Sequence, residues 1–220
     1  AGIIHQLNFD APAPEQISNV HVTSTPGGAI ITYKIPNDIN LSYVKAIYEI
    51  QPGVFREAKS SYYRDTLELV GYGDTLTHQA SIYSVGRNEK MSQPLIIDIK
   101  PLTPPIKSIF DSLFLDATFG GVIVNFKNSS KADLAINLLM MDDSLHVWVP
   151  VMSHYTNALE GTFTARGFES EERKFAACVR DRWYNKSDTL IKVLTPWHEE
   201  LVPKSLFKVL PLEGDFWQPQ

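Results

Sequence analysis

The sequence predicts an all-β protein made of two tandem β-sandwiches of the immunoglobulin-like or fibronectin type III-like kind. First, segment 24–34 is answered 93 residues later by segment 117–127, and Arg87 corresponds to Arg182 at a spacing of 95. Second, 14 prolines and 12 glycines divide the chain into short apolar segments, which leaves few windows for an amphipathic helix. A repeat of this length can enclose its own hydrophobic core, so the chain is two copies of one domain.

Each copy contains about seven short β-like segments with turns every 8 to 12 residues, which is typical of such sandwiches. The strands expected in the first copy are 17–24, 28–35, 43–50, 53–59, 65–71, 77–85 and 94–100. Those expected in the second copy are 110–118, 121–128, 134–141, 145–151, 160–167, 173–180 and 188–195.

Local patterns support these strands. Alternation places Val44, Ala46, Tyr48 and Ile50 on one face of the third strand. The glycine pairs at 27–28 and 120–121 lie between the first two strands of each copy, where a tight hairpin requires positive φ. A phosphate-binding loop would need a helix to follow, and β-branched residues follow here instead.

The domain organisation follows from the repeat. We expect an N-terminal extension at 1–14, domain 1 at 15–102, domain 2 at 103–200 and a C-terminal tail at 201–220. The tail is expected to open a third domain or to add a strand to the second. Segment 100–105 reads Lys-Pro-Leu-Thr-Pro-Pro, which predicts a short, stiff, non-helical hinge.

Composition excludes several function classes. The net charge is −5 with both signs interspersed, which offers no electrostatic reason to bind nucleic acid or an anionic membrane. No apolar run approaches the length of a membrane span, and no signal peptide is visible, so the chain is either cytosolic or already trimmed. Cys178 is the only cysteine, which excludes an intrachain disulfide; it is either a small strand residue or a reactive thiol.

Six unusual motifs, in order along the chain, resemble those of a known family. They lie at 26–33, 43–46, 60–62, 100–105, 166–168 and 180–183. The chain resembles, from residue 15 to residue 215, the uncharacterised surface lipoproteins of gut commensal bacteria. These carry two fibronectin type III-like domains followed by a discoidin-like, galactose-binding-type domain, of which this chain would lack the greater part.

The resemblance implies export to the cell surface or outer membrane and a role in glycan binding or adhesion. The implied partners are polysaccharides or surface proteins. Membrane attachment would occur only through an N-terminal lipid anchor that is not present in these residues. The family has no established catalytic residues, so the resemblance transfers none.

Signatures of catalysis or metal binding do not occur. The six histidines lack the His-Glu-x-x-His spacing of a zinc hydrolase, and no Gly-x-Ser-x-Gly elbow of a serine hydrolase is present. Acidic pairs such as Asp142-Asp143 and Glu199-Glu200 are explained by turns between strands. The sequence therefore predicts no catalytic residues, no metal site, no cofactor and no enzymatic activity.

Aromatic residues are the better candidates for function, because sugars stack their C–H faces on Trp and Tyr rings. All four tryptophans lie in the second half, and one of them belongs to a predicted loop between the last two strands. The candidate ligand-binding residues are Arg182, Trp183 and Tyr184 of that loop. The alternative is that Trp183 packs across the sheet edge or against the hinge, while the charged residues beside it form ion pairs.

These observations predict a non-enzymatic, exported surface protein that acts as a spacer or adhesion module and serves polysaccharide recognition. One alternative is that this chain itself binds a glycan or protein, through the loop around Trp183 or through the cleft between the domains. A further alternative is an accessory unit of a glycoside hydrolase.

Overall fold

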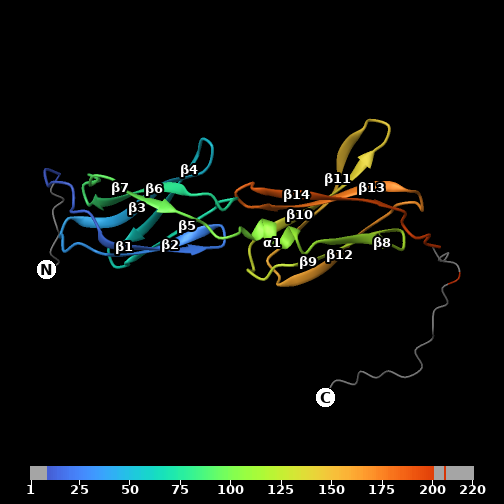
Figure 1. Ribbon diagram of the computed structural model, residues 1–220, viewed down its shortest axis with the longest axis horizontal. Helices are drawn as coiled ribbons and strands as arrows, with labels where there is room; N and C mark the ends of the chain where they lie inside the picture. The colour runs from blue at the N-terminus through green and yellow to red at the C-terminus, as the bar shows by residue number, and fades with distance from the viewer. Residues whose placement is uncertain (1–8, 201–205, 207–220) are drawn as a thin grey trace, which may run out of the picture.

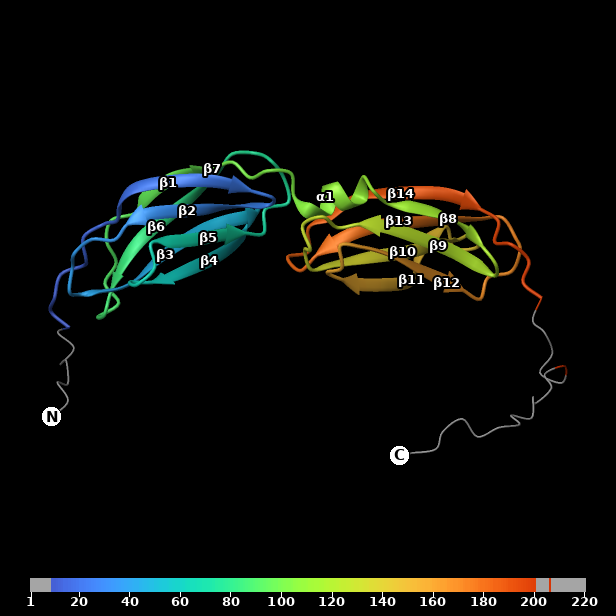
Figure 2. The same cartoon turned by 90° about the horizontal axis from the view of Figure 1, so that it is seen from below.

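The computed structural model describes residues 9–200 and residue 206. Two β-sandwiches, here called domain 1 and domain 2, lie end to end, and a short helix stands at the start of the second (Figures 1 and 2). This confirms the predicted fold class of two tandem fibronectin type III-like sandwiches.

Domain 1 consists of two antiparallel sheets with three and four strands. The first has the order β1-β2-β5 and contains β1 (Ser18–Thr25), β2 (Gly28–Lys34) and β5 (Thr66–Val70). The second has the order β4-β3-β6-β7 and contains β3 (Leu41–Gln51), β4 (Val54–Ser61), β6 (His78–Gly86) and β7 (Leu95–Ile99).

Domain 2 repeats this topology after the helix α1 (Pro105–Phe110). Its three-stranded sheet has the order β12-β9-β8 and contains β8 (Phe114–Thr118), β9 (Gly121–Lys127) and β12 (Glu160–Arg166). Its four-stranded sheet has the order β11-β10-β13-β14 and contains β10 (Leu134–Asp142), β11 (Val147–Thr156), β13 (Arg173–Asp181) and β14 (Lys186–Leu194).

The core of each domain is formed by the inward-facing residues of both sheets. In domain 1 the alternation predicted for the third strand is confirmed, because Val44, Ala46, Tyr48 and Ile50 are all buried. In domain 2 the strands β10 and β13 contribute the corresponding inward side chains, among them Ile136. Fully burying one such aliphatic side chain stabilises a domain by roughly 1.5–3 kcal/mol.

The glycine hairpins have the predicted backbone conformation. Gly27 and Gly120 have φ angles of +65° and +60°, in the left-handed region that favours glycine. The glycine that follows each lies against the backbone carbonyl of a neighbouring strand, at Leu69 and Ala165, where a side chain would collide. The pairs therefore form turns.

The hinge differs from the prediction at its last residue. The helix α1 begins at Pro105, within the segment expected to be non-helical, because proline is well suited to the first position of a helix. Ile106 and Ile109 of this helix are buried in the core of domain 2. The predicted strand 110–118 accordingly begins only at Phe114.

The predicted strand 145–151 was also too short at its end. The strand β11 continues to Thr156, and its pairing with β10 shifts by one residue between Leu138 and Leu139. This bulge interrupts the alternation of side chains along the strand, so a pattern of period two could not follow it to the end.

The two domains meet at the end of domain 1 that carries its first hairpin, and we call this contact region the joint. The chain leaves domain 1 next to its first hairpin, where the amide of Leu102 donates to the carbonyl of Thr25 at 3.0 Å. On the other side of the joint, Trp183 packs against the core of domain 1. Its ring faces Gly71, where a β-carbon would lie 3.2 Å from the ring atoms.

Asn185 closes the joint with hydrogen bonds across it. Its side-chain amide donates to the carbonyl of Gly71 at 2.9 Å and its oxygen accepts from Gln51 Nε2 at 2.5 Å. Asn185 is buried, so both bonds are shielded from water, and a lost partner would leave a buried polar group unpaired.

The joint depends on the absence of a side chain at residue 71, and domain 2 offers a matched control. Gly71 and Gly167 occupy equivalent turns, with φ of +106° and +95°, but nothing lies within 4 Å of a β-carbon at Gly167. Alanine at either position adds left-handed strain of roughly 1–2 kcal/mol. We expect only Gly71→Ala to widen the distribution of domain orientations in small-angle X-ray scattering as well. Equal scattering by the two variants would contradict this joint.

Candidate functional site

The turn between β13 and β14 is built by Asp181. Its Oδ1 accepts hydrogen bonds from the backbone amides of Trp183 at 2.8 Å and Asn185 at 2.9 Å. Its Oδ2 accepts from Asn185 Nδ2 at 2.8 Å. Burial raises the pKa of Asp181, although these hydrogen bonds and the charge of Arg180 act in the opposite direction. The carboxylate thus stabilises the turn through three hydrogen bonds.

The three residues predicted as a ligand site point to different places. Trp183 packs against the core of domain 1, and the guanidinium of Arg182 lies 4.4 Å from its ring centre. Tyr184 is 71% exposed and lines a cavity of about 630 Å³ together with Gln51 and His78. Only Arg182 reaches the pocket described next. A ligand contact by Trp183 and Tyr184 stays a prediction.

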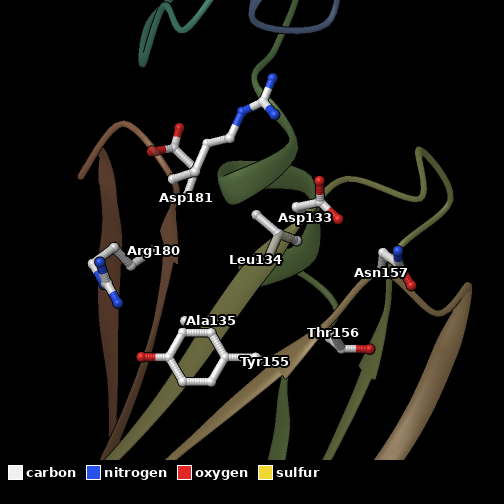
Figure 3. Close-up of a pocket in the computed structure, with 9 residues that line it drawn as sticks. Asp133, Leu134, Ala135, Tyr155, Thr156, Asn157, Arg180 and Asp181 are labelled. Atoms are coloured by element: carbon white, nitrogen blue, oxygen red, sulfur yellow. The ribbon is translucent and has the colours of Figure 1, made fainter.

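A pocket of about 370 Å³ opens on domain 2 beside the joint (Figure 3). Strand pairing explains its shape: Ala135 of β10 lies opposite Tyr155 of β11 on one side and opposite Arg180 of β13 on the other. The small side chain between two large ones forms the floor. Figure 3 shows Asp133 and Asn157 on the part of the wall farther from Tyr155.

The corresponding place in domain 1 is filled. There Tyr43 stands where domain 2 has Ala135, with Val85 and Ser61 on its two sides. The phenol of Tyr43 donates to Glu89 at 2.8 Å, and Lys59 lies 5.4 Å from its ring centre. The replacement of tyrosine by alanine therefore creates the pocket in one copy and not in the other.

The pocket continues into the cleft between the domains. A cavity of about 440 Å³ is lined by Gly27, Glu68 and Tyr72 of domain 1 and by residues of domain 2. It shares Asp133 and Arg182 with the pocket of Figure 3. We call the two adjoining cavities the trough.

One ring and one arginine of the trough, Tyr155 and Arg182, are exposed, whereas Arg180 is half-buried. Tyr155 is 72% exposed. The guanidinium of Arg180 lies 5.0 Å from the ring centre of Tyr184. Among the described residues, neither Arg180 nor Arg182 forms an ion pair within 4 Å, in contrast to the ion pairs expected beside Trp183.

Sequence reasoning missed Tyr155, Ala135 and Asn157 as candidate site residues. A signal existed, because the site lies where the two copies differ: Arg180 replaces Val85, and Ala135 replaces Tyr43.

The other candidate sites considered from the sequence are a reactive cysteine, a metal site and a membrane span. Cys178 is half-buried in β13. In the described part of the chain, no group of three His, Cys, Asp or Glu residues could hold a metal ion, and no helix could cross a membrane.

The fold and the joint define the class as a tandem pair of fibronectin type III-like domains. Residues 14–101 match the family described as Domain of unknown function (DUF4959), and residues 102–205 match Domain of unknown function (DUF5126). No curated protein matches the chain significantly.

Several solved structures are similar to the chain. A SusE-like protein is 26% identical with a TM-score of 0.37; the match covers 42% of this chain and 32% of that one. A two-domain fibronectin type III segment of chicken tenascin is 10% identical with a TM-score of 0.38, covering 82% and 99%. The chicken interferon gamma receptor alpha chain is 10% identical with a TM-score of 0.35, covering 82% and 98%. The chain thus matches only about a third of the SusE-like protein's length.

The role of Asn185 in the joint can be tested with Asn185→Ala. The change removes bonds to Gly71 and Gln51 and leaves buried groups unpaired, so we expect a loss of about 1–3 kcal/mol in thermal unfolding and a wider range of domain orientations. Asn128→Ala is the control, because Asn128 is also buried but its side chain bonds only within domain 2, to Ser130 and Ala132. A loss of stability in both variants with no difference in scattering would argue against the joint.

Asp181 should leave a signature in the pH dependence of stability. Between the ordinary value of 3.8 and the raised pKa, the folded chain holds a proton that the unfolded chain has released. This part of the stability is full below 3.8 and is lost as pH rises through the raised pKa. We expect Asp181→Asn to remove this component from a plot of unfolding midpoint against pH. A variant with an unchanged plot would show that the Asp181 pKa is not raised.

Proposed function

We propose that this protein is a non-enzymatic surface module that acts as a spacer and adhesion element in polysaccharide recognition. The observation that carries the proposal is the locked joint, in which Trp183 and Asn185 fasten domain 2 to domain 1. A flexible linker would let the two domains move independently, whereas a locked joint holds whatever they carry at a fixed distance and angle. The proposal places the chain at the outer cell surface, attached by the lipid anchor that the sequence resemblance implies.

A second candidate function is favoured by the trough. An exposed aromatic ring beside convergent polar groups suits a sugar, because the ring stacks on C–H faces while polar groups bind hydroxyls. Tyr155 supplies such a ring, and Asp133 and Asn157 supply the polar groups. On this proposal the chain itself binds a glycan, through the domain 2 pocket and the cleft next to Trp183.

A glycan array tests the second candidate. We expect the chain to bind at least one polysaccharide, and Tyr155→Ala to weaken that binding by about tenfold through loss of ring stacking. Trp183→Ala is unsuitable as the test, because it also breaks the joint.

Tyr63→Ala is the matched control. Tyr63 is 79% exposed and lies at the β4–β5 turn of domain 1, away from the trough, so its loss should leave binding unchanged. Equal binding by the Tyr155 and Tyr63 variants would remove the trough as the site. Release of reducing ends from the bound polysaccharide would contradict the non-enzymatic proposal.

A further inference from the structure

The two arginines of the trough present free hydrogen-bonding edges. Arg180 and Arg182 lie over the rings of Tyr184 and Trp183, at 5.0 Å and 4.4 Å from the ring centres. A guanidinium that stacks through its face keeps its N–H edge available and is held in one orientation. Among the described residues no carboxylate lies within ion-pairing distance of either group. In the described part of the chain, both arginines therefore present hydrogen-bond donors that no carboxylate occupies.

The acidic residues nearby do not occupy the N–H edges of these arginines. The carboxylate of Asp181 is already filled by three hydrogen bonds from its own turn. The pocket of Figure 3 thus contains two guanidinium groups and two carboxylates, and of the carboxylates that of Asp181 is engaged in its own turn. The cleft beyond adds one charge of each sign, Lys131 and Glu68, so the preference for a carboxylate comes from the unoccupied N–H edges of the two arginines and not from an excess of positive charge.

We propose that the trough binds a polysaccharide that carries carboxylate groups, that is, one containing uronate sugars. The inference rests on the glycan-binding function proposed above and specifies its ligand class. The planar fork of arginine matches a carboxylate with two parallel hydrogen bonds, which neutral sugars do not offer. Tyr155 stacks on the sugar ring, and Asp133 and Asn157 bind its hydroxyls.

The shape of the trough indicates a polymer and not a single sugar. The pocket of about 370 Å³ and the cleft of about 440 Å³ share Arg182 and Asp133 in their walls, so neighbouring sugars of one polymer can lie in both. Arg182 then contacts the polymer at the boundary between the two cavities, and Arg180 contacts it inside the pocket.

The experiment uses pairs of polymers that differ only in charge. Polygalacturonate, alginate and hyaluronan are each compared with their fully methyl-esterified forms, which keep the sugar backbone and remove the negative charge. We expect at least one acidic form to bind at least about tenfold more tightly than its ester, with an affinity that falls as salt rises.

Variants that introduce the residues of domain 1 at the equivalent places test the site. Arg180→Val restores the valine that domain 1 has at this place, and Ala135→Tyr restores the tyrosine that fills the pocket there. Each should weaken binding of the acidic polymer by about tenfold or more. Arg180→Lys keeps the charge but loses the fork, so it should bind with intermediate affinity. Arg64→Ala removes the same charge from an exposed turn of domain 1 and should bind like the parent chain.

The outcomes separate this inference from the function on which it rests. Binding of acidic and esterified forms with equal affinity, abolished by Ala135→Tyr, keeps the glycan site and overturns its preference for carboxylates. Failure of all three acidic polymers to bind, together with binding of a neutral glycan on the array, has the same meaning. Failure of every glycan overturns both. Loss of binding in Arg64→Ala equal to that in Arg180→Val would reduce the effect to net charge and overturn the site.

Discussion

The contact between the ring of Trp183 and the backbone of Gly71 determines how the two sandwiches meet, because a side chain at residue 71 would occupy the space that the ring needs. The ring covers the end of the domain 1 core, and Asn185 uses the remaining backbone carbonyl of the same turn. An apolar contact and buried hydrogen bonds thus stabilise the same interface. The neighbouring domain covers this end of the domain 1 core and shields it from solvent.

The same loop serves the trough because its residues alternate in direction. Trp183 turns towards domain 1, whereas Arg182 turns towards the pocket of domain 2 while resting on the Trp183 ring. Asp181 permits these two directions, because its carboxylate stabilises the turn through the backbone amides and the side chains of Arg182 and Trp183 are not needed to form the turn. The Trp183 ring therefore supports the guanidinium of Arg182, and a ligand contact by Trp183 itself stays a prediction.

Much of the fold could be predicted because the sequence contains two copies of the same domain. The repeat and the alternation of side chains located the strands to within a few residues, and the paired glycines located the hairpins. The helix at Pro105 was not predicted, because the prolines of this segment were taken to exclude a helix. Proline disfavours helix interiors but suits the first position of a helix, and composition alone does not distinguish the two.

The site was harder to predict for two physical reasons. The joint brings together Gly71 and Asn185, which are 114 residues apart in the chain, and local pattern contains nothing about such contacts. The pocket depends on a missing side chain at Ala135. Its counterpart, Tyr43, is displaced from the simple 93-residue spacing by the irregular pairing between Leu41 and Tyr43, so an ungapped overlay places Ser42 there instead.

Because the walls of the trough come from both domains, occupancy of the trough and the angle of the joint are thermodynamically linked. Any ligand that touches both walls binds more tightly when the joint is closed, and by the same free energy it makes the joint harder to open. On the proposal that the protein is anchored at one end and binds a polymer in the trough, the bound polymer would stiffen the joint. A mechanical load that bends the joint would in turn weaken binding of the polymer.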